Sequence, residues 1–466
     1  NRNVKNASIG ISLFLILSLI SDKIKSEIKK CEVFIMIYVS NSTELIAALR
    51  DTDTNIVVTR NMTLPTPIIL PEGIILRGED QENGISPSIF FSHSDGFILT
   101  GTSTISNLTI STLQNKKAIQ LLPQQSRPNY GTITLEDLIV DGQISLIFRT
   151  PTLSAHVETH RVHVRAADTR TYPEQPQKYG VNVFQGSFTL YNFNADADSR
   201  VTADISNLNI GQEGQPVIGS GIFISGFNDF GGQVEINTMT IKNVYSTGLL
   251  PQGVANIITG AVFIVYGARV HNLHQFGSVT TYGVNDMVLD AWGRVDKWVV
   301  EGEVTSYGQS GVGFVNFGRV DYFEAKSAIS TYGVGARAYN QYDGTLLEGH
   351  FSDINTYNDG AVGIQISKKV GQLHIHGSIS TYGSIGQSLV KGVNVDLPAY
   401  VFSIKDGGRI ENLYVKGSFI SHGAGVTTIT MEEGAEIKTV KIDGEITAKG
   451  TNSQSFSDEK TKTRFI

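Results

Sequence analysis

The sequence predicts an all-β chain wound into a single parallel β-helix, and three observations carry that prediction. A Ser/Thr-Tyr-Gly tripeptide recurs at a constant interval, strand-like alternation fills each interval, and no helix-length segment with helical periodicity interrupts it. Solenoids that place a helix in every repeat are thereby excluded. A unit of roughly 25 residues, built only from short strands and glycine turns, is typical of one coil of a β-helix.

The repeat is clearest at five tyrosines whose positions rise in equal steps along the chain. They are Tyr282, Tyr307, Tyr332, Tyr357 and Tyr382. After one longer step the tripeptide returns as Ser421-His422-Gly423. The sequence therefore predicts an insertion of about 15 residues, which we place at 391–405 as a loop because insertions are tolerated in turns.

Stacking of the coils converts this repeat into columns of side chains. Equivalent residues of successive coils lie about 4.8 Å apart, and side chains alternate along a strand, so an inward Ser306 directs Tyr307 outward. We expect an exposed tyrosine column and, beside it, a second outward column: Thr280, Thr305, Ser330, Asn355 and Ser380. The inward hydroxyls are expected to hydrogen-bond along the stack. They belong to Thr281, Ser306, Thr331, Thr356 and Thr381.

The upstream coils are less regular, but asparagines mark recurring corners. Asn107, Asn207 and Asn412 follow the same Ile-x pattern, with Asp137 as a looser copy, and such side chains can bond the backbone at a bend. The segment from Asn41 to Arg50 begins with a capping box and predicts one short amphipathic helix that covers the open amino-terminal end. Residues 166–179, with two prolines, are predicted to form an excursion loop.

The two ends of the chain differ in composition from the β-helix, which we assign to 36–450. Residues 1–35 contain an apolar run behind Arg2 and Lys5, which fits either a secretory signal or an extension upstream of a start at Met36. The first alternative predicts an extracellular or cell-surface protein, whose only membrane contact is this segment, and the second a cytoplasmic one. Residues 451–466 are polar and predict a frayed tail.

Composition narrows the partners and cofactors. The 37 Lys and Arg against 44 Asp and Glu give a net charge of −7 without basic runs, which argues against nucleic acid. Because Cys31 is the sole cysteine, an intramolecular disulfide and thiolate metal clusters are excluded. We expect no cofactor and no defined metal site. Calcium stays open at the run from Asn194 to Asp198, although Ser199 and Ile205 stand where an EF-hand needs Gly and Glu.

A charged column offers the one catalytic hypothesis. Arg294, Asp296, Arg319 and Asp321 occupy equivalent positions in successive coils, with Arg269 and His271 one coil earlier. An arginine there can perturb or abstract a proton next to a uronate, with the carboxylates positioning a cation or acting as general acids. The alternative is a surface ion ladder. His374 and His376, which share one strand face, can chelate a metal, but no third ligand lies nearby in sequence.

Three segments carry a resemblance to a known group. VSNSTELIAALR at 39–50, IILPEGIILRGE at 68–79 and ISNLTIS at 105–111 resemble the first coils of the pectin-lyase-like superfamily of right-handed β-helices. The resemblance implies extracellular carbohydrate chemistry, as in lyases, polygalacturonases, epimerases, tailspikes and adhesins. The catalytic motifs of the polygalacturonases and pectate lyases are not found in this sequence. The resemblance therefore concerns the pattern of the fold.

These observations favour a protein that engages polysaccharide or a cell-surface glycan along the tyrosine column. Flat aromatic rings with a polar tip suit sugars, and a preformed column lowers the ordering cost of binding. One alternative is a lyase, hydrolase or epimerase that acts on acidic glycans through the charged column. Another is a structural adhesin or tailspike-like rod, in which the tyrosines only stabilise neighbouring coils.

Overall fold

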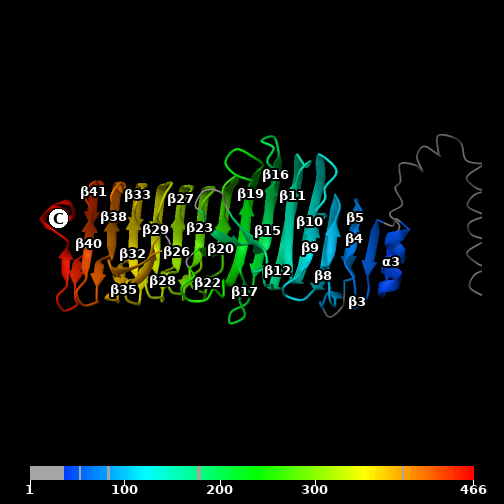
Figure 1. The fold of residues 1–466 in the computed structure, drawn as a ribbon, viewed down its shortest axis with the longest axis horizontal. Coiled ribbons are helices and arrows are strands. Elements are labelled where there is room, and N and C mark those ends of the chain that lie inside the picture. The colour runs from blue at the N-terminus through cyan, green and yellow to red at the C-terminus, as the bar shows by residue number, and fades with distance from the viewer. Residues whose placement is uncertain (1–35, 52–53, 81–83, 176–179, 255, 391–392) are drawn as a thin grey trace, which may run out of the picture.

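The computed structural model describes residues 36–51, 54–80, 84–175, 180–254, 256–390 and 393–466. These form the predicted all-β parallel β-helix, with strands stacked coil upon coil from α3 at one end to the carboxyl terminus at the other (Figure 1). The run predicted to be a signal or an upstream extension lies outside the described residues. Among the described helices, none is long and apolar enough to span a membrane.

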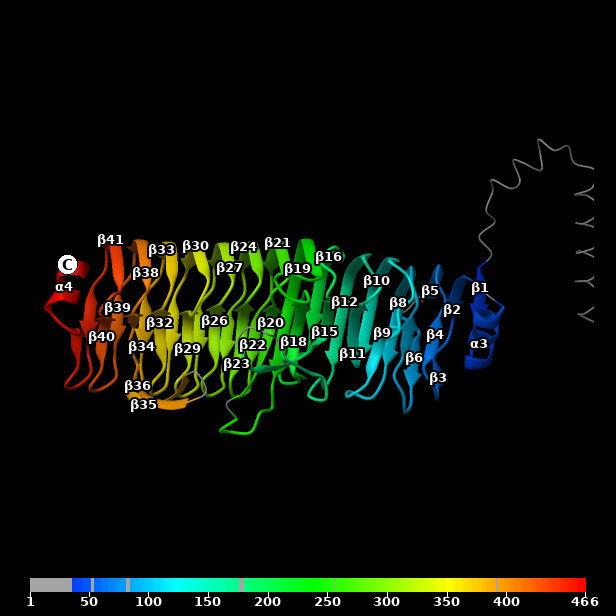
Figure 2. The same cartoon turned by 45° about the horizontal axis from the view of Figure 1, so that its top comes forward.

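One coil of the regular half shows how the repeat unit folds. Strands β24 (Arg294–Val300) and β25 (Val304–Ser306) belong to the first sheet, and β26 (Val312–Asn316) belongs to the second. The next coil repeats them as β27 (Arg319–Ala325), β28 (Ile329–Thr331) and β29 (Arg337–Gln341). All three pairs are parallel and in register, so the sequence interval becomes a stack of coils along the long axis of the molecule (Figure 2).

The remaining strands extend the same columns in both directions. One column of the first sheet contains β1 (Ile37–Val39), β2 (Asn55–Val58), β5 (Ile74–Gly78), β8 (Ser103–Ser111), β10 (Asn129–Asp141), β12 (Ser154–Ala166), β16 (Arg200–Ile210), β19 (Gln233–Thr247), β21 (Ala268–Gln275), β24, β27, β30 (Thr345–Phe351), β33 (Lys369–Ile375), β38 (Arg409–Val415) and β41 (Glu436–Ile442). The other strands of this sheet are β3 (Met62–Leu64), β6 (Ser88–Phe91), β17 (Val217–Ile218), β22 (Val279–Thr281), β25, β28, β31 (Ile354–Thr356), β34 (Ile379–Thr381), β39 (Phe419–Ser421) and β42 (Ile446–Ala448). The second sheet contains β4 (Ile68–Leu70), β7 (Phe97–Leu99), β9 (Lys117–Leu121), β11 (Gln143–Arg149), β15 (Gly186–Phe193), β18 (Ser220–Ser225), β20 (Ile257–Ile264), β23 (Asp286–Ala291), β26, β29, β32 (Val362–Ile366), β37 (Phe402–Ile404), β40 (Thr427–Met431) and β43 (Gln454–Phe456).

The inward side chains form one continuous apolar core along the stack. Trp298, Phe314 and Phe323 are fully buried, and the Phe314 and Phe323 rings stack with centroids 4.0 Å apart. Apolar side chains from the facing strands fill the interior of each coil, and burial of this surface stabilises the fold by about 25 cal/mol per Å².

The inward hydroxyl column is buried as predicted, but its hydrogen bonds differ from the expectation. Thr281 donates to Ser306 of the next coil at 3.4 Å. Thr356 and Thr381 instead donate to carbonyl groups within their own coils, those of Ala361 and Ala399, both at 2.9 Å. The nearby carbonyls offer a shorter route to satisfying a buried hydroxyl.

The glycine of the tripeptide is explained by how closely the coils approach. A β-carbon at Gly308 would overlap the carbonyl oxygen of Gly283 one coil earlier, and the same overlap recurs for Gly333 on Gly308. Asn358 replaces glycine in the fourth copy, and its amide donates to the carbonyl of Tyr332 at 3.3 Å. The tripeptide therefore marks the turn at which successive backbones come closest.

The asparagine corners are confirmed in the amino-terminal half. Asn107, Asp137 and Asn207 adopt left-handed backbone conformations with φ of 51°, 52° and 56°, which Asn and Asp tolerate better than most residues. The Asn107 amide donates to the carbonyl of Gly78 at 3.2 Å. The same expectation for Asn412 is wrong, because this residue does not adopt the left-handed backbone conformation and continues strand β38 in register with Gln372.

The first helix among the described residues is α3 (Ser42–Arg50), and it begins at the predicted capping box. The Asn41 side chain accepts a hydrogen bond from the amide of Glu44 at 3.0 Å, and the Glu44 carboxylate accepts one from the amide of Ser40 at 2.7 Å. Leu45 and Ala48 on its inner face are buried in the core cluster. In Figure 1 the helix lies at the amino-terminal end of the stack.

The inserted residues form a hairpin rather than a loop at 391–405. Strands β35 (Ile385–Val390) and β36 (Val393–Pro398) pair antiparallel, and the chain has returned to the second sheet by β37. Since the hairpin starts directly after Tyr382-Gly383, the insertion lies a few residues earlier than predicted. The excursion at 166–179 likewise contains a short strand, β13 (Pro173–Glu174), which pairs with β14 (Asn182–Phe184).

The carboxyl-terminal prediction of a polar tail at 451–466 is wrong. Strand β43 adds to the second sheet, and helix α4 (Glu459–Phe465) follows, with Asp458 as its N-cap. Phe465 is buried and packs edge-on against Phe402, with ring centroids 6.2 Å apart. Phe465 anchors this segment over the last coils. A prediction from the polar composition of the segment does not detect a single apolar anchor.

Candidate functional site

The five predicted tyrosines form one continuous column of stacked rings. Centroid separations from Tyr282 to Tyr382 are 5.5, 5.0, 4.7 and 5.1 Å, with interplanar angles between 6° and 18°. His422, from the shifted copy of the tripeptide, continues the column at 4.4 Å from Tyr382. Each ring follows directly after a short strand whose register is fixed by backbone pairing, which explains the regular spacing.

The column exposes ring edges and hydroxyl groups, not ring faces. Tyr307, Tyr332, Tyr357 and Tyr382 are 40–49% exposed, yet each face is covered by a neighbouring ring. None of these four hydroxyls makes a hydrogen bond to another described residue. The expected stacking of sugars on tyrosine faces is therefore sterically blocked inside the column, and only edge and hydroxyl contacts are available.

The second outward column contributes less surface than expected. Thr280, Thr305 and Ser380 are buried, whereas Ser330 and Asn355 are half-buried. The accessible strip is therefore essentially the phenol edges.

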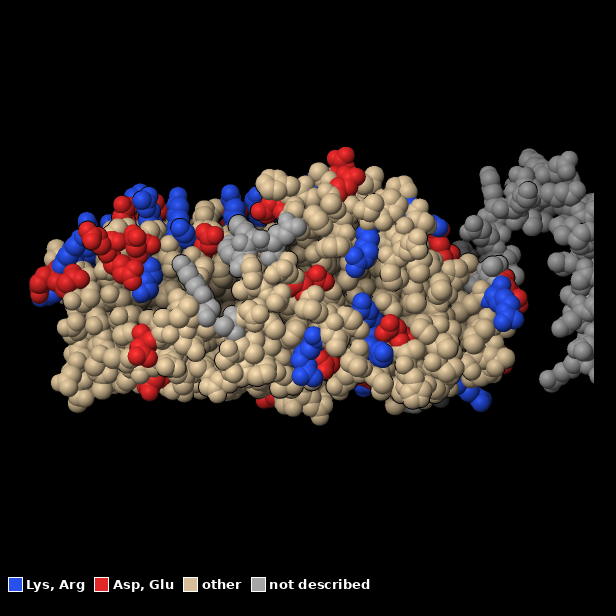
Figure 3. Space-filling model, viewed as in Figure 1, with Lys and Arg blue, Asp and Glu red and all other residues tan. Residues whose placement is uncertain are grey.

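Charged side chains are unevenly distributed over the face that Figure 3 shows. Acidic and basic side chains gather along the upper edge of the carboxyl-terminal half, over β27, β33, β38 and β41. The lower edge of this face, near β22 and β28, shows few of them.

The charged column predicted from sequence is an alternating ion ladder. Asp296 pairs with Arg269 at 2.7 Å and with Arg294 at 2.8 Å. Asp321 in turn pairs with Arg294 at 3.2 Å and with Arg319 at 2.7 Å. Each carboxylate thus lies between two arginines of adjacent coils, which relieves the repulsion that stacked arginines would otherwise produce.

The ladder holds the Asp296 carboxylate in the ionised form. Partial burial alone would raise the pKa of Asp296, but hydrogen bonds from Arg269, His271 and Arg294 outweigh it and lower the pKa to about 2. A carboxyl group with this pKa is deprotonated at neutral pH and cannot donate a proton as a general acid. The arrangement is suited to tying coils together.

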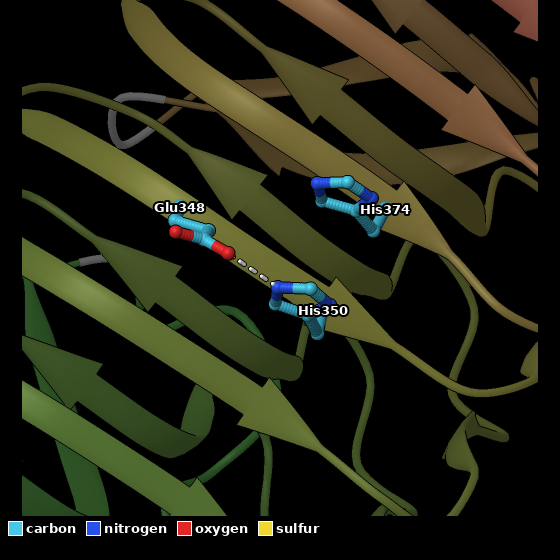
Figure 4. A group of neighbouring side chains, drawn as sticks. All are labelled: Glu348, His350 and His374. Atoms are coloured by element: carbon cyan, nitrogen blue, oxygen red, sulfur yellow. Dashed lines mark hydrogen bonds and ion pairs between the residues drawn. The ribbon is translucent and has the colours of Figure 1, made fainter.

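A cluster of imidazoles lies on the outer face of β30 and β33 (Figure 4). His350 hydrogen-bonds to Glu348 at 2.8 Å and to His376 at 2.9 Å, and its ring stacks on His374 at 4.5 Å and 3°. Burial, together with the neighbouring His350, lowers the pKa of His374. Glu348, His350 and His374 have ligand atoms within 4.8 Å of one another, so they are the described residues that can approach one metal ion.

The observed ring orientations do not complete a metal site. A metal ion bound by an imidazole lies in the plane of that ring, and two parallel stacked rings cannot both point to one ion. Ligation would require one histidine to leave the stack. The cluster therefore acts as a stacked and hydrogen-bonded surface network in this conformation.

The run from Asn194 to Asp198, for which calcium stayed open, uses its oxygens in its own turn. Asn194 accepts from the amide of Asp196 at 3.0 Å, and Asp196 accepts from the amide of Asp198 at 2.9 Å. The Asn194 amide also donates to the carbonyl of Thr152 at 2.7 Å. These contacts account for the polar side chains as turn-forming groups.

Sequence reasoning missed a cavity on the outer surface of the β-helix. We call this cavity the hairpin pocket. It has a volume of about 560 Å³ and lies over β23, β26 and β29. Leu389 and Val390, near the tip of the hairpin, lie beside it. Arg337, Asn340, Trp292 and Phe317 are among the residues that line it. No repeat signal reveals it, because the hairpin and the β20 region contribute to it from outside the regular coils.

Two buried carboxyl groups lie on β23, the strand that contributes Met287 to the pocket. Burial raises the pKa of Asp286 to about 6 against the hydrogen bonds that it accepts from Thr259, Gly248 and Gly283. Burial also raises the pKa of Asp290 well above its usual value. Neither residue was singled out from sequence.

Comparison of the chain with models of known protein families, with curated proteins and with solved structures gave no match.

Proposed function

We propose that this protein binds an extended polysaccharide along the tyrosine column. The observation that carries the proposal is the column's spacing: phenol rings recur with centroids 4.7 to 5.5 Å apart over five coils, and four of the five are exposed. This interval is close to the length of one hexose unit in an extended glycan chain. A sugar chain laid parallel to the axis of the β-helix therefore meets an equivalent tyrosine at each unit.

The chemistry of the edge suits such a ligand. Each exposed phenol hydroxyl can donate and accept a hydrogen bond, which matches the hydroxyl groups of a sugar. Because neighbouring rings hold one another in place, little side-chain entropy is lost on binding. The individual contacts are weak, and affinity arises from their repetition along one polymer.

The resemblance of the amino-terminal coils to the pectin-lyase-like superfamily supports a carbohydrate ligand. Membership of that superfamily, and a location outside the cell or at its surface, form part of this proposal. Polysaccharide is the partner that the resemblance implies, and the spacing of the tyrosine column supports it.

The ion pairs of the charged column support a binding protein or a structural rod rather than an enzyme. A lyase, hydrolase or epimerase at Arg294, Asp296, Arg319 and Asp321 requires a free acid or base. In the described part of the chain these four groups are paired with one another.

Retention of the protein on immobilised polysaccharides tests the proposal. We expect retention of the wild-type chain on a panel of extended glycans, and its loss in a Tyr307→Ala/Tyr332→Ala double variant. Tyr38→Ala provides the matched control, since Tyr38 is comparably exposed but lies outside the column. Equal retention of the double variant and the control would refute the proposal.

A further inference from the structure

The hairpin pocket contains a buried arginine without an acidic partner. Arg337 on β29 is only 4% exposed, and none of the ion pairs among the described residues includes it. Its Nε atom has no hydrogen-bond partner, and its Nη1 atom reaches only the carbonyl of Gly335, at 3.5 Å.

Such a group is costly for the fold. Burying a charge without a partner costs several kcal/mol, and proteins usually compensate with a carboxylate. Burial lowers the pKa of Arg337 to about 10, which leaves the guanidinium charged at neutral pH. Equivalent positions in the adjacent coils, Val312 and Val362, are apolar, so the coil itself does not require an arginine here.

The walls of the pocket define the body of a ligand. Val312, Val315, Met287 and Leu389 supply aliphatic surface, and Trp292, Phe317 and Tyr342 supply aromatic surface. Trp292 and Phe317 have centroids 5.4 Å apart, and Phe317 and Tyr342 4.6 Å, so the aromatic side chains form a continuous row. Apolar walls with one buried cation are complementary to an amphipathic anion.

The hairpin closes one side of this space through specific contacts. The Leu389 amide donates to the Ser310 hydroxyl at 3.1 Å, and the Ser388 hydroxyl donates to the Gly335 carbonyl at 2.8 Å. Gly335 is the residue whose carbonyl also faces Arg337. The hairpin is therefore anchored next to the Arg337 guanidinium. The insertion in the repeat thus forms one wall of the pocket.

We propose that the hairpin pocket binds a small organic carboxylate with an apolar or aromatic body, and that Arg337 pairs with the carboxylate. A guanidinium offers two parallel N–H donors to a carboxylate, which satisfies the open donors of Arg337 in one contact. This site is separate from the tyrosine column and does not depend on the proposed glycan binding.

Calorimetry with a matched pair of probes tests the inference. We expect 2-naphthoate to bind the wild-type chain, and 2-naphthamide, its neutral counterpart, to bind about ten- to a hundredfold more weakly, since a charge-assisted pair is lost. Arg337→Met should abolish this preference while keeping or raising the melting temperature, because it removes an unpaired buried charge. Arg319→Met, at an exposed arginine of the ladder, should leave the preference unchanged.

Three results would overturn the inference: equal affinity of the wild-type chain for both probes, undiminished binding of 2-naphthoate by Arg337→Met, or no binding of either probe. If Arg337→Met does not fold, Val312→Trp decides the question. This substitution fills the pocket from the sheet surface and should abolish 2-naphthoate binding. Persistent binding would place the probe elsewhere and refute the assignment.

Discussion

The tyrosine column makes a quantitative prediction about coupling between coils. Tyr332 has two stacked neighbours, Tyr307 at 5.0 Å and Tyr357 at 4.7 Å. A stacked aromatic pair contributes about 0.5–1.5 kcal/mol beyond the area that it buries. Tyr332→Ala should therefore lower the free energy of unfolding by about 1–3 kcal/mol through the loss of two such pairs.

A double-mutant cycle isolates the pairwise part of this energy. Alanine substitutions at Tyr307 and Tyr332, singly and together, should give a coupling energy of about 0.5–1.5 kcal/mol. Urea unfolding, followed by the fluorescence of the two buried tryptophans, Trp292 and Trp298, supplies the free energies. The control cycle pairs Tyr307 with Tyr382, whose rings are not in contact, and should give coupling within about 0.5 kcal/mol of zero. Equal coupling in the two cycles would refute the reasoning that adjacent rings hold the coils together.

Three further predictions concern titration and close packing. Because the pKa of Asp296 is lowered to about 2, its ionised form contributes about 1 kcal/mol to the free energy of unfolding, after allowance for solvent screening. This contribution is present above pH 4 and is lost as the pH falls toward 2. Asp296→Asn should flatten this part of the stability profile. Because the pKa of Asp286 is raised to about 6, the free energy of unfolding should increase by about 3 kcal/mol as the pH falls from 6 toward 4. The free energy of unfolding of Asp286→Asn should show no such increase. Gly308→Ala should lower the melting temperature markedly, since its β-carbon overlaps the Gly283 carbonyl, whereas Gly73→Ala, with no atom nearby, tests the backbone strain alone.

The regular half of the fold could be predicted because a fixed interval leaves little freedom. Once Thr331 lies above Ser306, the pleat determines that Tyr332 lies above Tyr307, and the ladder of Arg294 and Asp296 follows from the same register. Columns of like residues can thus be predicted from a linear sequence.

The imidazole cluster shows where this reasoning fails. In the strand register, Arg319 lies opposite Thr345, and His350 lies opposite His374. The sequence interval from Arg319 to Thr345 is slightly longer than the interval between the tyrosines, and the interval from His350 to His374 is slightly shorter. This shift around the turn at Gly344 hides the column from a search at the regular interval. The sequence indicated that His374 and His376 lie close together, because they are two residues apart. It did not indicate that Glu348 and His350, which belong to the adjacent coil, lie beside them.

The hairpin pocket could not be predicted for a different reason. Its walls combine the sheet surface with an insertion and with residues near β20, and nothing in a single sequence specifies how an insertion folds back on the coils. Arg337 stands where neighbouring coils carry Val312 and Val362, but an isolated departure from a repeat does not indicate whether the side chain is buried.

Hydroxyl-radical footprinting in the presence of a retained polysaccharide tests the central claim most directly. We expect the polymer to reduce the oxidation of Tyr307, Tyr332, Tyr357 and Tyr382 together, while the oxidation of Tyr38 stays unchanged. Protection that spares these four tyrosines, in a sample that demonstrably holds the polymer, would contradict the claim that the column is the surface on which the glycan lies.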